Sequence, residues 1–127
     1  MLGLELHPAS RVIAYGQVGG AVALRDAGRL LAENGAPAAI VAGVDSFLLA
    51  ETIRHYDCAD RLLNPANSNG FIAGEAGAAA LVMPAAASEG GHLALAGLGF
   101  GAEGAPIRSG EPLRADGLTA AMRAALD

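Results

Sequence analysis

The residue whose position most invites chemistry is Gln17, in the stretch RVIAYGQVGG. An apolar run stops at Gly16, and a helical pattern begins on Gly19 and Gly20. A junction of this kind between a strand and a helix commonly presents a reactive or ligand-binding side chain. A glutamine amide can donate a hydrogen bond to an oxyanion, but it can neither attack as a nucleophile nor titrate. We therefore expect Gln17 to satisfy backbone groups at the turn, with a direct ligand role as the alternative.

Three further polar residues stand at a glycine turn or at the end of an expected strand. Glu75 lies in the short sequence GEAG, where a carboxylate most often accepts backbone hydrogen bonds. Asp45 and Ser46 end an apolar run, and ligands often bind at such strand ends in α/β proteins. We expect a structural role for Glu75 and a plain strand-end cap at Asp45 and Ser46. Catalysis by Glu75 is the alternative.

The single cysteine, Cys58, follows His55 by three positions in the sequence RHYDCAD. The two residues could form a nucleophile pair or bind a metal, but two ligands do not make a zinc site. Nothing in the sequence brings His7 or His92 to join them. We therefore expect no metal and no cofactor.

The glycines around Gln17 could also form a phosphate-binding loop, because the N-terminus of a helix attracts anions. However, Gly16-x-x-Gly19-Gly20 fits neither the dinucleotide fingerprint nor the P-loop. The chain also contains no lysine that could reach a phosphate. A phosphate-binding loop is therefore kept only as an alternative.

Composition narrows the classes of function. The chain has 127 residues, which fits one domain over residues 1–127, and its net charge is −5. No basic cluster favours nucleic acid, and no apolar run approaches the roughly 20 residues that cross a bilayer. The start of the chain lacks the pattern of a secretion signal. We expect a cytoplasmic protein that binds neither nucleic acid nor membrane.

Three elements must position Gln17. The sequence predicts a short buried strand over Val12 to Tyr15, a helix over Val18 to Asn34, and a strand over Ala38 to Ser46. The last run is continuously apolar, which is typical of a parallel strand buried on both faces. Together they predict a right-handed βαβ unit. The charged residues of the helix fall within one arc of about 100°, so the helix should be nearly submerged. They are Arg25, Asp26, Arg29 and Glu33.

The rest of the chain predicts an α/β protein with no second domain. Phe47 to Leu63 indicates one or two short helices, and Asn64 to Gly70 indicates a loop. Strands are expected over Ala76 to Met83 and over His92 to Gly101. A final helix runs from Asp116 to Asp127 without a stop signal, which leads us to expect a piece of a longer protein.

The stretch GQVGGAVALRDAGRLLAENGAPAAIVAGVDS resembles the nucleophile region of β-ketoacyl-acyl carrier protein synthases, the condensing enzymes of the thiolase fold. In that family a strand ends at a cysteine that opens a long buried helix, and the next strand closes on Ala-Gly-Gly. Here that strand closes on Ala42-Gly43-Val44. Counting back from it places the family's nucleophile position on Gln17.

A second stretch, NSNGFIAGEAGAAALVM, is similar to the family's Asp-Gly-Phe-x-x-Gly-Glu-Gly-Ala signature, which leads into a strand. The residues that match are Gly70, Phe71, Gly74 and Glu75. The chain departs from the signature at Asn69, where Asp is usual, and at Ala76, where Gly is usual. The closing LRADGLTAAMRAALD resembles the first helix of the family's second half.

The resemblance implies a partial thiolase-like module with a mixed sheet and a central buried helix. It covers well under half of such an enzyme, and neither the cysteine nor the family's pair of active-site histidines is matched here. Some non-condensing relatives carry glutamine at the position of Gln17, namely chain-length-factor subunits and decarboxylating loading domains. We therefore expect a β-ketoacyl synthase-like module of fatty acid or polyketide biosynthesis that does not condense alone.

The alternative is a non-catalytic pairing or scaffold subunit that resembles a chain-length factor. The resemblance places the strand from Ala38 to Val44 at a dimer interface, and a truncated sheet exposes edges and apolar faces. The expected partners are a second copy or a complementary synthase chain, with acyl carrier protein as a further candidate. An enzyme of another class that uses Gln17 and Glu75 ranks last, because no nucleophile, base and oxyanion set converges.

Overall fold

The computed structural model describes residues 5–87, 90–106 and 109–127 of the chain. The described elements, in chain order, are the 3-10 turn η1 (Gly16–Val18), α1 (Gly19–Glu33), β1 (Ala39–Ser46), α2 (Ala50–Cys58), β2 (Glu75–Val82), the 3-10 turn η2 (Ala85–Ala87) and α3 (Asp116–Leu126). The architecture is therefore mixed α/β in a general sense. Among the described residues, no helix combines the length and the apolarity that a bilayer crossing requires.

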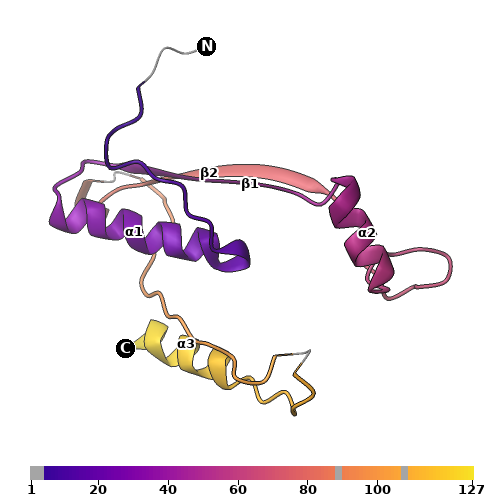
Figure 1. Cartoon of the computed structure of the whole chain (residues 1–127). Helices are drawn as coiled ribbons and strands as arrows, with labels where there is room; N and C mark the ends of the chain where they lie inside the picture. The colour runs from indigo at the N-terminus through magenta and orange to yellow at the C-terminus, as the bar shows by residue number, and fades with distance from the viewer. Residues whose placement is uncertain (1–4, 88–89, 107–108) are drawn as a thin grey trace.

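The sheet consists of β1 and β2, which pair antiparallel from Ala39 opposite Val82 to Ser46 opposite Glu75. They form the long arm of Figure 1, and α2 lies at its far end. Both predicted strands are confirmed to within about one residue of their expected bounds. The expected parallel pairing of β1 is wrong, because its backbone hydrogen bonds go to a strand that runs the opposite way.

The expected βαβ unit is absent from the described residues, because Val12 to Tyr15 forms no strand. This segment has no neighbouring strand to supply a ladder of hydrogen bonds, and Val12 is 94% exposed. Gly35 ends α1 with φ +64°, as the sequence predicts, but the chain then enters an antiparallel pair.

Helix α1 lies along the half of the β1–β2 pair that is farther from α2, and it packs mainly against β1 (Figure 1). The predicted helix over residues 18–34 is confirmed as Gly19–Glu33. The expectation that it is nearly submerged is wrong, since its buried residues are Val22, Asp26 and Ala27. Two strands cover only one side of a helix, so the other sides stay open. Asp26, which was assigned to the outward charged arc, is instead the buried charge of this helix.

Helix α3 packs against the extended segment that holds three alternating glycines, Gly97, Gly99 and Gly101. A Cβ atom added at Gly99 would overlap the carbonyl oxygen of Ala121, so backbone meets backbone here. The predicted helix over residues 116–127 is confirmed as Asp116–Leu126. The strand predicted over residues 92–101 is wrong, because the segment packs on a helix and joins no ladder.

Helix α2 and the following loop form a small lobe around three aromatic rings. Tyr56 lies between Phe47 and Phe71, with ring centroids 5.4 Å and 5.1 Å from theirs. The two phenylalanine rings meet edge to face at 5.8 Å. Offset and edge-to-face contacts of this kind add to the stabilisation that burial provides. The lobe fixes Phe71, one of the signature residues, against the end of β1.

Candidate functional site

Gln17 lies in η1, directly before α1 begins, as the sequence predicts. The turn is closed by the backbone, because the N–H of Val18 donates to the carbonyl of Tyr15 and that of Gly19 to Gly16. Gly16 has φ +52°, a backbone conformation that residues with a side chain rarely adopt. Within the described residues, the exposed side chain of Gln17 makes no hydrogen bond. The expectation that this amide satisfies the turn is therefore wrong, because the backbone satisfies itself.

Glu75 is the first residue of β2 and lies opposite Ser46, the last residue of β1. The Ser46 hydroxyl donates to Oε2 of Glu75 over 3.1 Å, and its oxygen accepts the N–H of Leu48 over 3.3 Å. Ser46 thus caps the strand end as expected. The carboxylate of Glu75 accepts a side-chain hydroxyl rather than the backbone N–H groups that the glycine turn predicts, because Ser46 faces it across the ladder.

Gln17 and Glu75 do not form one site in the described structure. No hydrogen bond joins their side chains there, and they lie on separate elements, η1 and β2. Asp45 lies next to Ser46 on β1, is exposed, and forms no ion pair among the described residues. The residues selected from the sequence therefore lie in two places: Gln17 at the turn over residues 16–20, which we call the elbow, and the others at the paired ends of β1 and β2.

Asn67 organises the loop between α2 and β2, residues 59–74, which we call the signature loop after the resemblance noted in its sequence. The sequence predicts only that Asn67 lies in a loop. Its amide nitrogen donates to the carbonyls of Asp60 and Leu62 over 2.6 Å and 3.2 Å. Its amide oxygen accepts the N–H of Asn69 over 3.1 Å. Gly70 lies so close to Leu62 that a Cβ atom would overlap the Leu62 backbone. The three asparagines of this loop could have predicted such bonds, because asparagine side chains often form hydrogen bonds with the nearby backbone.

Cys58 and His55 both lie on α2. Cys58 is a free, exposed thiol at the last residue of the helix. The His55 ring packs edge-on against Tyr56, with centroids 5.1 Å apart. In the part of the chain that the structure describes, no three histidine, cysteine or acidic side chains are placed to hold a metal ion.

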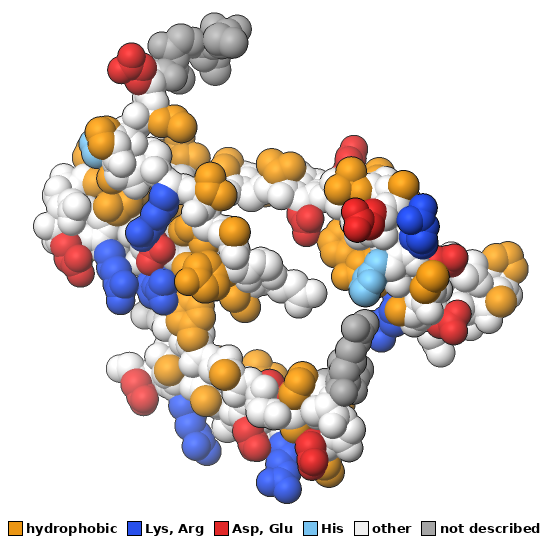
Figure 2. Space-filling view, viewed as in Figure 1, with side chains coloured by type: hydrophobic (Ala, Val, Ile, Leu, Met, Phe, Trp, Pro, Cys, Tyr) orange, Lys and Arg blue, Asp and Glu red, His pale blue; other side chains and the backbone are white. Residues whose placement is uncertain are grey.

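A pocket that sequence reasoning missed lies between α1 and the segment before η1. We call it the Asp26 pocket; it is lined by Arg11, Tyr15, Val22, Arg25, Asp26 and Arg29, with two further apolar residues. Figure 2 shows blue arginine side chains gathered over α1, with a partly covered red carboxylate between them. No local signal marks this pocket, because Arg11 meets Asp26 only after the chain has folded back.

Asp26 is held by two ion pairs. Oδ2 lies 2.7 Å from Nη2 of Arg11, and Oδ1 accepts from Nε and Nη2 of Arg25, each over 3.2 Å. The Asp26 side chain is only 10% exposed, whereas those of Arg11 and Arg25 are 58% and 41% exposed. The carboxylate therefore lies at the floor of the pocket and the guanidinium groups at its rim.

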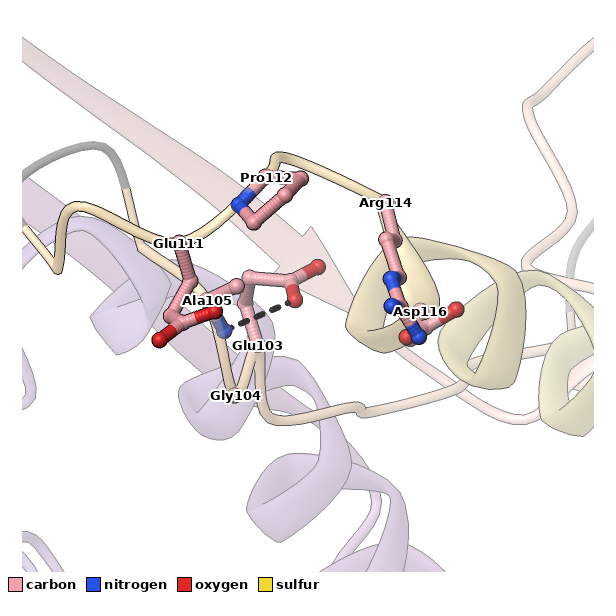
Figure 3. Close-up of a pocket in the computed structure, with 7 residues that line it drawn as sticks. All are labelled: Glu103, Gly104, Ala105, Glu111, Pro112, Arg114 and Asp116. Atoms are coloured by element: carbon pink, nitrogen blue, oxygen red, sulfur yellow. Dashed lines mark hydrogen bonds between the residues drawn. The ribbon is translucent and has the colours of Figure 1, made fainter.

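A second pocket lies at the start of α3, and Figure 3 shows the residues that line it. Glu103 accepts the N–H of Ala105 at Oε1 and the N–H of Gly117 at Oε2, each over 3.1 Å. A carboxylate at this position satisfies a free N–H group in the first turn of the helix and complements the helix dipole. Glu103 therefore caps the start of α3, and both of its carboxylate oxygens are used in backbone hydrogen bonds.

No described group of side chains combines a nucleophile, a base and an oxyanion donor. Gln17 offers an unengaged amide at a helix start, and the Asp26 pocket offers arginines at a rim. Comparison with protein-family models, with curated proteins and with solved structures finds no match to this chain.

Proposed function

We propose that this chain is a thiolase-like module of the β-ketoacyl synthase kind, acting in the cytoplasm in fatty acid or polyketide biosynthesis, and unable to condense alone. The observation that carries the proposal is the exposed Gln17 at the leading end of α1. The order of helix, strand, signature loop and strand along the chain also fits that family. The thiolase-like fold is part of the proposal.

The chemistry explains why such a module would be inert. Condensation by this route needs a thiolate that holds the acyl chain, and the positive end of a helix favours a thiolate. Here that place at the start of α1 is held by an amide, which cannot form a thioester. Cys58, the only thiol of the chain, lies on α2 instead.

Acyl transfer tests this proposal directly. The chain is incubated with radiolabelled acyl-acyl carrier protein, and protein-bound label is measured after acid quenching. We expect no label above that of the Cys58→Ser variant. Stable thioester label on Cys58 would contradict the proposal, because it would reveal a nucleophile that we exclude.

An engineered thiol tests whether the elbow has the expected electrostatics. In a Cys58→Ser background, Gln17→Cys should react with iodoacetamide faster at pH 7 than Cys58 of the unmodified chain, which is an exposed thiol at the last residue of α2. The reason is that the partial positive charge at the start of α1 stabilises the thiolate. Equal rates at the two positions would show that the elbow does not activate a nucleophile.

A second candidate function is that of a pairing or scaffold subunit, and the exposed surface favours it. The chain exposes 10511 Å², against about 6,200 Å² for a compact monomer of its mass. The excess, about 4,300 Å² on one chain, is more than one partner usually buries in an obligate interface, which is about 1,000–2,500 Å², half of the total for the pair. A second copy or a complementary synthase chain would cover part of it, and acyl carrier protein remains a further candidate partner.

The uncovered face of the sheet is the surface that such a partner would meet. Ile40, Val44 and Leu81 share one face of the β1–β2 pair and are 74%, 88% and 62% exposed. Size-exclusion chromatography with light scattering should give a mass above 12.6 kDa at micromolar concentration. Val44→Glu should lower that mass, whereas Asp45→Asn, on the other face, should not. A monomer for the unmodified chain, tested without a partner chain, would remove the self-association.

A further inference from the structure

We propose that the Asp26 pocket binds an oxyanion of the phosphate monoester class, held by Arg29 and by the outward N–H groups of Arg11 and Arg25. The inference is independent of the proposed synthase-like function, because it rests on a different surface of α1. Gln17, the glycines around it and the signature loop do not line this pocket.

The charge of the pocket is opposite to that of the whole chain. Three arginines and one aspartate line the pocket, which gives it a formal charge of two positive units in a chain whose net charge is −5. A phosphate monoester carries about −1.5 to −2 units at pH 7. The ligand charge that neutralises the pocket is thus that of a phosphate dianion.

The donors that such a ligand needs remain free at the rim. A guanidinium group has five N–H donors. Asp26 engages Nη2 of Arg11, and Nε and Nη2 of Arg25, so each group keeps further N–H donors. Arg29 lines the same pocket and forms no ion pair within the described residues. Planar guanidinium forks match the oxygens of a phosphate in pairs.

Two of the three arginines, Arg11 and Arg25, are held before any ligand arrives. Asp26, at the floor of the pocket, fixes both Arg11 and Arg25. The Arg25 guanidinium also lies over the ring of Phe100, with Cζ 5.3 Å from the ring centroid. Groups fixed in the bound geometry lose less conformational entropy on binding. Asp26 and Phe100 are therefore positioning residues for this pocket.

The pocket is too local to favour nucleic acid. The described arginines outside it are dispersed over α2, the loop after it, the segment before α3, and α3 itself. Recognition of a nucleic acid backbone needs contacts that repeat along several phosphates. One cluster of three arginines suits one phosphate group.

Titration calorimetry at low, constant ionic strength tests the inference with three probes: inorganic phosphate, phenyl phosphate and benzoate. We expect saturable binding of the phosphates, and benzoate should bind at least about tenfold more weakly because it carries one charge. Tighter binding of phenyl phosphate than of inorganic phosphate would identify an organic phosphate as the ligand, and equal binding would identify the free anion. Both results support the site. No saturable phosphate binding, or equal affinity for benzoate, would overturn it.

Variants decide whether the pocket is responsible. Arg29→Gln should weaken phosphate binding by about tenfold, the worth of a hydrogen bond to a charged group. Arg54→Gln removes the same charge from exposed α2 and should leave binding unchanged. Equal weakening by both variants would show that net charge alone attracts the anion, and the site would be rejected. Both residues are exposed, so far-ultraviolet circular dichroism should show unchanged folding.

Discussion

The hydroxyl of Ser46 donates a hydrogen bond of 3.1 Å to Glu75 across the last register pair of β1 and β2. The next backbone link, from the N–H of Phe47 to the carbonyl of Gly74, is 2.9 Å long. Side chain and backbone therefore close the sheet together at the point where the chain enters the α2 lobe. The role of Glu75 that this geometry supports is structural.

Removal of this carboxylate should weaken the strand end slightly. We expect Glu75→Ala to lower the free energy of unfolding by about 0.5–1 kcal/mol, since the bond is exposed to water. Glu75→Gln should cost less, because an amide oxygen still accepts from the hydroxyl. Urea denaturation followed by circular dichroism measures both. In a double-mutant cycle, Ser46→Ala should cost less in the Glu75→Ala background than in the unmodified chain, where it loses both the bond to Glu75 and the cap on the Leu48 N–H. Fully additive effects would mean that the pair does not interact.

Two glycines of the signature loop, Gly70 and Gly74, should differ in how much stability they lose when replaced by alanine. At Gly70 a methyl group would overlap the backbone of Leu62, so Gly70→Ala must displace the loop. At Gly74 nothing lies within 4 Å of the added carbon, and the Gly74→Ala variant should be tolerated. We expect a loss of about 1–3 kcal/mol at Gly70, in the range of overpacked sites. Urea denaturation of the two variants measures this, and similar stabilities would contradict the close approach.

The contact between the glycine segment and α3 permits a third comparison. A methyl group at Gly99 would overlap the carbonyl of Ala121, whereas one at Gly104 meets nothing within 4 Å. Gly99→Ala should therefore loosen α3 and increase hydrogen exchange at its amides, while Gly104→Ala should not. The expected cost at Gly99 is about 1–3 kcal/mol. Unchanged exchange in α3 would show that the helix does not depend on this segment.

The sequence predicts the elements of this chain better than their partners. The helix over 18–34 and the strand over 38–46 are recognisable because local periodicity and the Asn34-Gly35 stop are contained in the segment itself. The direction of strand pairing is not local. Ser46 meets Glu75 across 29 positions of the chain, and no alternation of apolar residues in β1 indicates whether that neighbour runs parallel.

The same distinction between local and long-range features applies to the candidate sites. The position of Gln17 at the start of α1 follows from the glycines around it, and the structure confirms that position. The burial of Asp26 does not follow from the helical arc, which places it beside Arg25 and Arg29 as a solvated charge. Arg11, 15 positions earlier, folds back over it and converts the arc into a pocket. The burial of Asp26 is therefore seen only once the folded path of residues 11–15 is known.

Asp26 should be the most sensitive of the charged residues of α1. Asp26→Asn removes the charge from both ion pairs and leaves two guanidinium groups beside an amide. We expect a loss of about 1–2 kcal/mol, above that of exposed pairs and below that of fully buried ones, because the arginines remain half exposed.

Glu33→Gln is the matched control for Asp26→Asn, since it removes the same charge from an exposed position of the same helix. Its effect should stay within about 0.5 kcal/mol. Urea denaturation at low and at high salt distinguishes the two residues, because screening acts less on the 10%-exposed carboxylate than on surface charge. If Asp26→Asn were as mild as Glu33→Gln in both salts, the arginines would not depend on Asp26, and its positioning role in the pocket would fail with it.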